Sequence, residues 1–202
     1  EGVEGCGKSY QSKKLFSILK KNKIDTILTR EPGGTKSSEL IRELILKDYF
    51  TKDTKEKFDK YTDTLLYLAA RNEHVKNKIK PALLKKKVVI CDRFIDSTIA
   101  YQVYGKKVDI KFINDIHKKI LGKIKPNLVF ILKVSAKSSK LRLKKRKSRN
   151  RYDNFSQSFY TKAQNSFIKI AKNKNNYFIL DSSSNDSTIE KNIFSIVKKY
   201  LN

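Results

Sequence analysis

Apolar residues along the chain alternate between two spacings. In some stretches they recur every three or four residues, as on one face of a helix, for example at Leu15, Ile18 and Leu19. Short continuous apolar runs stand between these stretches and are typical of buried parallel strands. The pattern predicts strands at Thr26–Thr29, Val88–Cys91, Leu128–Val134 and Tyr177–Leu180. It predicts helices over residues 8–22, 36–47, 60–84, 95–103, 109–121, 136–147, 156–172 and 187–201.

This alternation of strands and helices predicts an α/β protein, with a parallel sheet covered by helices on both faces. The 202 residues fit one compact domain, and the sequence contains neither an internal repeat nor a linker-like stretch. In sheets of this kind, ligands bind beyond the carboxyl ends of the strands. We therefore expect the chemistry of the protein to lie in the segments that follow the strands.

The charge of the chain is strongly positive, with 46 basic and 20 acidic residues and a net charge of +26. A nucleic-acid binder would be expected to cluster these charges among aromatic residues. The lysines are instead spread evenly, which favours a biased coding sequence over a binding surface and makes nucleic acid an unlikely partner. Seven of the eight arginines fall in the motif segments described below, and Arg42 is the exception.

Targeting signals and cysteine usage point to the cytoplasm. No apolar run approaches the ~20 residues of a membrane-spanning helix, and no secretory signal pattern is present. The two cysteines, Cys6 and Cys91, do not form a disulfide framework of the secreted type. Two reduced thiols are the default interpretation, and a redox switch between them is the alternative.

The segment Gly2–Ser9 matches G-x-x-x-x-G-K-[ST], the phosphate-binding P-loop, at every fixed position. Glycines let successive backbone N–H groups form an anion-binding nest, which opens onto the N-terminus of the helix that follows. Lys8 is expected to reach the β- and γ-phosphates, and the Ser9 hydroxyl to bind Mg²⁺. Such a loop normally follows a strand, so we expect a first strand ahead of Glu1 that these 202 residues lack.

Three further segments narrow the function. Thr29–Thr35 reads T-R-E-P-G-G-T, Leu65–Val75 reads L-L-Y-L-A-A-R-N-E-H-V, and Asp92–Gln102 contains D-R-x₃-S-x₃-Y-Q. Together with the P-loop, and in this order, they resemble thymidylate kinase over nearly the whole chain. A simple Pro-Gly-Gly turn is the competing interpretation of the first segment. Lys133 departs from the family, whose strand usually ends in Asp at this position.

The resemblance implies a single domain over residues 1–202 with a three-layer P-loop kinase fold. Its parallel sheet would have five strands flanked by helices on both faces, and a lid segment would span approximately residues 141–154. The implied reaction transfers the ATP γ-phosphate to dTMP, giving dTDP and ADP for dTTP biosynthesis, with Mg²⁺ as cofactor. The resemblance also implies a cytoplasmic homodimer. Another nucleoside monophosphate kinase remains the alternative enzyme, because base choice depends on a few contacts.

The resemblance assigns dTMP-binding roles to a set of polar and aromatic side chains. Arg30 would grip the dTMP phosphate, Tyr67 would stack on thymine, and Glu4 would hold a sugar hydroxyl. Tyr101 would crowd out a 2′-hydroxyl, and Ser97 or Gln102 would bond the base. For Tyr67, a place in the core is the competing interpretation. The complete implied set is Glu4, Arg30, Pro32, Tyr67, Arg71, Arg93, Ser97, Tyr101 and Gln102.

The remaining implied residues belong to ATP binding and catalysis. The ATP site would comprise Gly2, Gly5, Cys6, Gly7, Lys8, Ser9 and Arg149, and the metal would be held by Ser9 and Asp92. Family members carry a catalytic arginine either in the P-loop or in the lid, and the glycine at position 5 with an arginine-rich lid fits the second type. A solvated basic helix is the competing interpretation of the lid. The implied catalytic residues are Lys8, Asp92, Arg93, Arg146 and Arg151.

Overall fold

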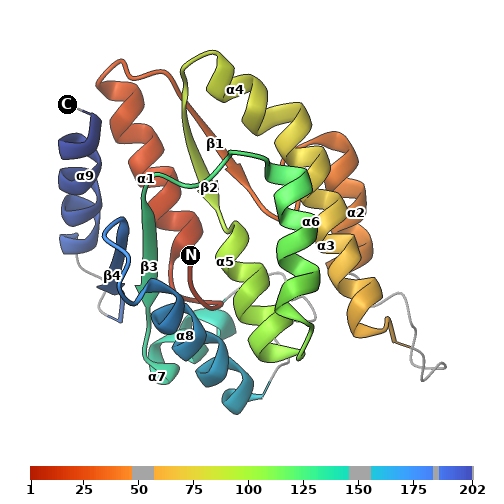
Figure 1. Cartoon of the computed structure of the whole chain (residues 1–202). Coiled ribbons are helices and arrows are strands. Elements are labelled where there is room, and N and C mark those ends of the chain that lie inside the picture. The colour runs from red at the N-terminus through yellow and green to blue at the C-terminus, as the bar shows by residue number, and fades with distance from the viewer. Residues whose placement is uncertain (47–56, 146–155, 184–186, 202) are drawn as a thin grey trace.

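The computed structural model describes residues 1–46, 57–145, 156–183 and 187–201. Helices and parallel strands alternate along the chain, as the hydrophobic pattern predicts (Figure 1). The strands are β1 (Thr26–Arg30), β2 (Val88–Asp92), β3 (Val129–Lys133) and β4 (Tyr177–Asp181). The helices are α1 (Lys8–Lys21), α2 (Lys36–Leu46), α3 (Lys60–His74), α4 (Lys80–Leu84), α5 (Ile95–Thr98), α6 (Ile110–Leu121), α7 (Ala136–Lys144), α8 (Gln157–Ala171) and α9 (Thr188–Leu201). Two π-helical segments, η1 (Val75–Ile79) and η2 (Ile99–Gly105), extend α3 and α5.

Local signals in the sequence account for several helix starts. The side chains of Asp59 and Asp109 each accept a hydrogen bond from a backbone N–H in the first turn of α3 and α6. Ser135 and Ser156 do the same for α7 and α8. Such caps satisfy backbone donors that have no partner inside the helix. The start of α1 differs, because it follows Gly7 directly, whose φ of 92° is open to glycine at low cost.

The strands pair in parallel but form two separate ladders. β1 pairs with β2 from Thr26↔Val88 to Arg30↔Asp92, and β3 pairs with β4 from Val129↔Tyr177 to Lys133↔Asp181. The described residues therefore do not contain the single five-stranded sheet that the sequence suggested. The reason is that β2 and β3 are not hydrogen-bonded to each other. Glu1 lies beside β3 instead, donating its terminal N–H to the Phe130 carbonyl and accepting from the Leu132 N–H.

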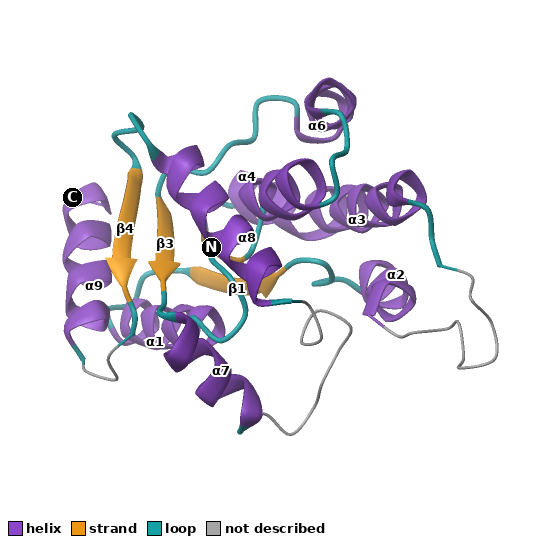
Figure 2. Cartoon of the chain, turned by 90° about the horizontal axis from the view of Figure 1, so that it is seen from below, coloured by secondary structure: helices purple, strands orange, loops and turns teal. Residues whose placement is uncertain are grey.

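Helices cover the strands from two sides and enclose the core. α1 packs against β1, β2 and α9, while α8 packs against β3 and β4 (Figure 2). The interior is apolar, with Leu19, Ile131 and Phe167 almost completely buried. Within the described residues, no helix is long and apolar enough to cross a membrane. Because the strands within each pair are parallel and in register, the carboxyl ends of β1 and β2 bring Arg30 and Asp92 together.

Candidate active site

The P-loop wraps around the N-terminus of α1 in a conformation that requires glycine. Gly2 and Gly5 have φ of 132° and 72°. A Cβ on Gly2 would stand 2.6 Å from the Leu132 carbonyl oxygen, and one on Gly5 would stand 2.9 Å from the Ser139 carbonyl oxygen. The loop therefore fits closely between β3 and α7, and its backbone amides lie beside the first turn of α1. The geometry is that of an anion-binding nest at a helix start.

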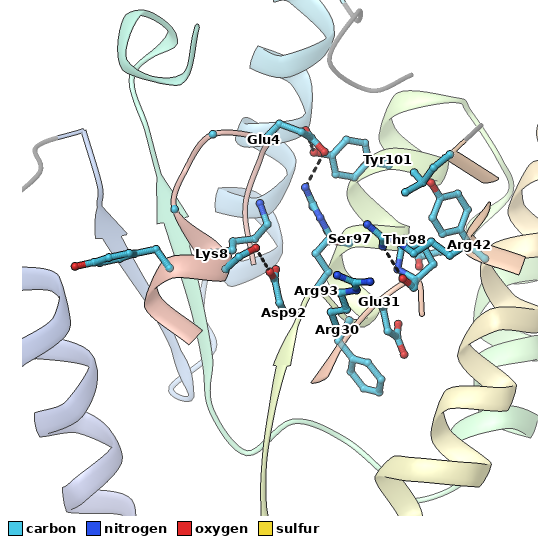
Figure 3. Close-up of a pocket in the computed structure, with 18 of the residues that line it drawn as sticks. Glu4, Lys8, Arg30, Glu31, Arg42, Asp92, Arg93, Ser97, Thr98 and Tyr101 are labelled. Carbon is cyan, nitrogen blue, oxygen red and sulfur yellow. Dashed lines mark hydrogen bonds and ion pairs between the residues drawn. The ribbon is translucent and has the colours of Figure 1, made fainter. Parts of the chain in front are cut away.

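Lys8 and Ser9 place a cation and a hydroxyl at the mouth of this loop. Lys8 Nζ donates to the Val3 carbonyl oxygen at 2.7 Å and lies 3.5 Å from Cys6 Sγ. Ser9 Oγ donates a hydrogen bond to Oδ2 of Asp92, the last residue of β2 (Figure 3). Lys8 is thus held against the loop whose amides would carry phosphate, and Cys6 is completely buried behind it.

Asp92 has the properties of a group that acts on a metal. Burial raises its pKa, but the charge of Lys8, the Ser9 hydrogen bond and Arg93 outweigh burial and leave the pKa lowered. Its Oδ1 is buried and has no hydrogen-bond partner among the described residues. Those residues hold no cluster of three or more His, Cys, Asp or Glu side chains for a metal. One carboxylate and one hydroxyl suit Mg²⁺, which usually keeps several waters and binds with substrate phosphates.

Arg93 connects the P-loop to the segment that follows β2. Its Nη2 donates to Glu4 Oε1 at 2.7 Å, and its Nη1 donates to the Gly2 carbonyl oxygen at 2.9 Å and Ser97 Oγ at 3.1 Å (Figure 3). Tyr101 donates its hydroxyl proton to Glu4 Oε2 at 2.6 Å, and its ring lies under the guanidinium of Arg93.

The charges in this cluster stabilise one another. Burial raises the pKa of Glu4, yet the nearby charges of Arg93 and Lys8 outweigh it and keep the carboxyl ionised. Burial and the Glu4 carboxylate both raise the pKa of Tyr101, so its hydroxyl keeps its proton and remains a donor. The cluster therefore holds an ionised carboxylate, a protonated phenol and a guanidinium within hydrogen-bonding distance of each other.

Arg30 and Arg42 add two more cations on the opposite side of the site. Arg30 Nη2 donates to the two oxygens of Glu39 at 3.2 and 3.0 Å, and Arg42 Nη1 donates to the Pro32 carbonyl oxygen at 2.6 Å. The Arg30 and Glu39 side chains are 55% and 38% exposed. An incoming phosphate can therefore compete with Glu39 for Arg30. Sequence reasoning missed Arg42, although its place three residues after Glu39 on α2 was a signal that it shares this face.

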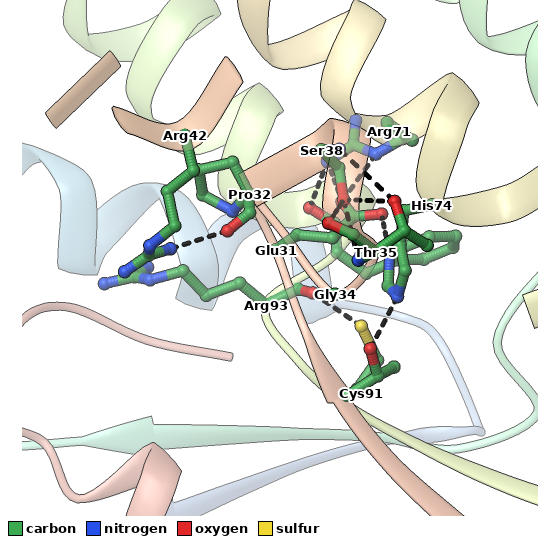
Figure 4. Close-up of polar contacts among 12 residues, drawn as sticks. Glu31, Pro32, Gly34, Thr35, Ser38, Arg42, Arg71, His74, Cys91 and Arg93 are labelled. Carbon is green, nitrogen blue, oxygen red and sulfur yellow. Dashed lines mark hydrogen bonds and ion pairs between the residues drawn. The ribbon is translucent and has the colours of Figure 1, made fainter. Parts of the chain in front are cut away.

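A second network, completely buried, lies under the loop after β1. Glu31 accepts hydrogen bonds from Arg71 at 2.7 Å and contacts His74 Nδ1 at 3.0 Å, while His74 Nε2 lies 2.6 Å from Thr29 Oγ1 (Figure 4). Sequence reasoning assigned Arg71 but missed Glu31 and His74. The only signal for them was their place inside the two motifs, since single histidines and glutamates carry no spacing pattern.

These groups surround one cavity of about 510 Å³. Of the residues named from sequence, the following line it: Glu4, Gly5, Gly7, Lys8, Ser9, Arg30, Pro32, Tyr67, Arg71, Asp92, Arg93, Ser97, Tyr101 and Gln102. Gly2 and Cys6 also belong to the P-loop, but they do not line the cavity. Tyr67 is half-buried, and it both lines the cavity and packs against the core. Its stacking on thymine stays a prediction.

Comparison with known proteins identifies the family. A family model described as thymidylate kinase matches residues 1–193. The thymidylate kinase of Wolbachia sp. subsp. Brugia malayi (strain TRS) is 44% identical over 177 residues, covering 86% of this chain and 80% of the relative. The chain belongs to the thymidylate kinase family. The thymidylate kinase of Ehrlichia ruminantium (strain Gardel) is 39% identical over 203 residues, covering 100% of this chain and 93% of the relative.

A solved structure of the thymidylate kinase family matches the fold. The crystal structure of thymidylate kinase from Ehrlichia chaffeensis has a TM-score of 0.73 and 32% identity, and covers 100% of this chain and 96% of that one. The family and the α/β P-loop fold predicted from sequence are thereby confirmed.

The lid arginines stay predictions, because Arg146, Arg149 and Arg151 lie outside the described residues. The helix that leads to them is described. Arg142 on α7 donates to the Gly5 carbonyl oxygen at 3.1 Å and to the Ser182 carbonyl oxygen at 2.7 Å. The end of α7 is thereby tied to the P-loop.

Cys91 does not have the surroundings of a reactive thiol. Burial raises its pKa well above the usual value, and the nearby carboxylate of Glu31 adds to this effect. Its Sγ donates to the Arg93 carbonyl oxygen at 3.1 Å. Because the thiolate is the reactive form, these contacts favour an unreactive structural thiol. Cys6 and Cys91 are both free thiols here.

Proposed function

We propose that this chain transfers the γ-phosphate of ATP to dTMP, giving ADP and dTDP for dTTP synthesis. The observation that carries the proposal is the convergence of the P-loop and the acceptor arginines on one cavity of about 510 Å³. Its volume lies in the range of small-molecule sites. Phosphoryl transfer depends on positioning and charge stabilisation more than on covalent chemistry, and this cavity is lined by such groups.

In this mechanism the two phosphates approach each other from opposite sides of the cavity. The P-loop amides and Lys8 bind the β- and γ-phosphates of ATP, while Arg30 and Arg93 bind the acceptor phosphate. Mg²⁺, when bound, neutralises charge on the donor phosphates, and Ser9 and the free Oδ1 of Asp92 would hold it. Arg93 contacts the P-loop at Gly2 and Glu4, so it is placed to stabilise charge on the group in transfer.

The acceptor side of the cavity supplies groups for a nucleobase and a deoxyribose. The Gln102 side chain is 1% exposed, and its Nε2 has no hydrogen-bond partner among the described residues. A buried donor of this kind is costly unless a ligand satisfies it, and a thymine carbonyl is such a ligand. Tyr67 offers a ring for stacking on the base. We assign Tyr101, whose hydroxyl is hydrogen-bonded to Glu4, to the exclusion of a ribose 2′-hydroxyl.

Closure over the donor would come from the residues after α7. Arg142 holds the end of this helix against the P-loop at Gly5. Arg142 and Lys145 at this end of the helix line the cavity, and further basic residues come next in the sequence. We assign Arg146 and Arg151 to charge stabilisation and Arg149 to ATP binding, in the arrangement with the catalytic arginine in the lid.

A fifth strand is proposed between β2 and β3. The two strand edges enclose a cavity of about 370 Å³, lined by apolar side chains such as Val89, Phe130 and Leu132. Glu1 would be the last residue of this strand, because its two hydrogen bonds to Phe130 and Leu132 have the alternating pattern of a parallel ladder. A segment of the protein ahead of Glu1 would continue the ladder and join the two pairs into a five-stranded sheet.

We propose that the protein is a cytoplasmic homodimer. The outer surface of α2 and α3 is the proposed interface between the two subunits. Leu40 and Leu44 share one face of α2, and Leu65 lies on the outside of α3, with exposed fractions of 67, 40 and 48%. α2 and α3 pack against each other, so these leucines lie on one pair of helices. Exposed apolar surface of this kind marks interaction sites.

Charged residues on this surface should break the dimer. The double variant Leu44→Glu with Leu65→Glu is expected to sediment as a monomer where the unmodified protein sediments as a dimer, because two carboxylates would be buried without partners. Leu84→Glu is the control, since Leu84 is 76% exposed at the end of α4. A dimer that survives the double variant would place the interface elsewhere.

The activity is tested by measuring ADP release by the full-length protein with Mg-ATP and one acceptor at a time. We expect turnover with dTMP to exceed that with dCMP or dGMP by at least about tenfold, since a base that offers Gln102 no carbonyl leaves this donor unpaired at a cost on the order of 1–3 kcal/mol. dUMP keeps both thymine carbonyls and lacks only the 5-methyl group, whose loss from an apolar pocket costs about 1–3 kcal/mol, so a preference over dUMP would rest on that methyl group. EDTA should stop turnover. Preference for another nucleoside monophosphate would keep the kinase chemistry and reject dTMP as the substrate.

A further inference from the structure

Arg71 lines the acceptor side of the cavity, yet groups of the protein itself contact all three nitrogens of its guanidinium. Nε and Nη2 lie 2.7 Å from Glu31 Oε2, and Nη2 also donates to the Phe94 carbonyl oxygen at 2.9 Å. Nη1 donates to Thr98 Oγ1 at 2.9 Å and contacts His117 Nε2 at 2.6 Å. A guanidinium held at all three nitrogens has a single orientation, and the residues behind it set that orientation.

Among these partners His117 comes from the most distant element, α6. Its side chain does not line the cavity, and the residue is 6% exposed. An arginine can only donate, so His117 Nε2 must be the acceptor and the ring proton must sit on Nδ1. Burial lowers the pKa of His117 to about 3, and the positive charge of Arg71 contributes. The imidazole is therefore neutral throughout the physiological range.

A neutral acceptor suits this position for an electrostatic reason. Glu31 already balances the charge of Arg71 through a buried ion pair. A second carboxylate here would leave a net negative charge buried, and an apolar side chain would leave an Arg71 N–H without an acceptor. The guanidinium lies 5.4 Å from the Phe94 ring, so its plane is also supported by an aromatic side chain. His117 completes this enclosure on the side of Nη1.

We propose that His117 is a positioning residue for dTMP recognition, acting through Arg71. It holds Nη1 so that the guanidinium keeps one orientation at the wall of the acceptor cavity, next to Tyr67 and Gln102. The inference rests on the proposed function, because it takes the ligand on that wall to be dTMP.

The first test compares two amide substitutions, His117→Asn and His117→Gln, which place the side-chain oxygen at different distances from the backbone. The Gln side-chain oxygen stands near the place of Nε2, whereas the Asn oxygen stands near Nδ1 and cannot reach Arg71. We expect His117→Asn to raise the Kd and KM for dTMP about tenfold with kcat changed less than about twofold, because binding that is equal in ground and transition states is lost. His117→Gln should stay within about threefold of the unmodified enzyme, and the KM for ATP should not change in either variant.

The second test shows whether the effect passes through Arg71. In an Arg71→Lys background, His117→Asn should add less than about a twofold change in the Kd for dTMP, since coupled residues are not additive. Lys118→Leu, on the exposed side of α6, serves as the surface control. Equal effects of Asn and Gln, or full additivity with Arg71→Lys, would overturn the proposal.

A third measurement reads the protonation state of His117 in the unmodified protein. The chain has two histidines, so ¹⁵N-histidine spectra of the unmodified protein contain two imidazoles. We expect one of them, assigned by its loss in His117→Gln, to be neutral with the proton on Nδ1 at pH 7. An imidazolium at that position would reject the proposal. Absence of dTMP turnover in the unmodified enzyme would instead reject the proposed function.

Discussion

Replacing Arg93 with alanine is expected to lower kcat/KM for dTMP by about a thousandfold or more. Arg93 is the one side chain among the described residues that bonds both the P-loop, at Gly2 and Glu4, and the acceptor segment, at Ser97. Arginines that stabilise a phosphoryl group in transfer contribute on the order of 10³–10⁵ to the rate. Coupled ADP release with dTMP and Mg-ATP measures the effect directly.

Loss of Arg93 also has a structural consequence, which must be separated from the kinetic one. Glu4 would remain buried without its ion-pair partner, at a cost on the order of 3–5 kcal/mol of unfolding free energy. The double variant Arg93→Ala with Glu4→Gln removes that charge. We expect urea unfolding to show most of the stability restored, while turnover stays lost. A folded double variant that works within tenfold of the unmodified enzyme would remove Arg93 from catalysis.

A large loss of stability is also expected from Gly34→Ala. Gly34 has φ of 96°, and an added Cβ would stand 2.6 Å from both His74 Nε2 and Thr29 Oγ1. Backbone strain costs on the order of 1–3 kcal/mol. Separating the buried His74–Thr29 pair costs about 1–3 kcal/mol more. Denaturant unfolding should therefore show a loss of about 3 kcal/mol or more.

Gly122→Ala is the matched control for this prediction. Gly122 also has a positive φ, 57°, but a Cβ there would meet no atom within 4 Å. We expect a loss of about 1–3 kcal/mol, which is the cost of the backbone conformation at φ 57° and ψ −117° alone. If the two variants lose the same stability, the contact with His74 and Thr29 is not what makes glycine necessary at position 34.

Sequence patterns were sufficient where the physics is local. The apolar pattern gave the type and approximate bounds of the described helices and strands, because a helix buries one face every 3.6 residues and a strand of a covered parallel sheet buries a short continuous run. The P-loop could be recognised because nest geometry needs glycines at fixed spacing. The P-loop and the three ordered motifs together resembled the family closely enough to name it. They also named most of the residues that line the cavity.

Contacts between distant segments could not be read in this way. Arg42, Glu39 and Glu31 reach the site through the packing of α2 and the loop after β1, and His117 reaches Arg71 from another helix 46 positions away. No spacing rule joins such pairs, because the chain between them sets their distance only after it folds. The division into two ladders was likewise invisible, since pairing partners depend on which strand edges meet.

The sequence by itself determined the succession of helices and strands, the phosphate loop and the family, because each of these depends on residues that are close together in the sequence. The tertiary structure decided which charges face each other. It placed Glu4 against Arg93, Glu39 against Arg30 and the neutral His117 against Arg71. These pairings set protonation states and side-chain orientation, since a buried charge is stabilised only by the particular groups that packing brings to it.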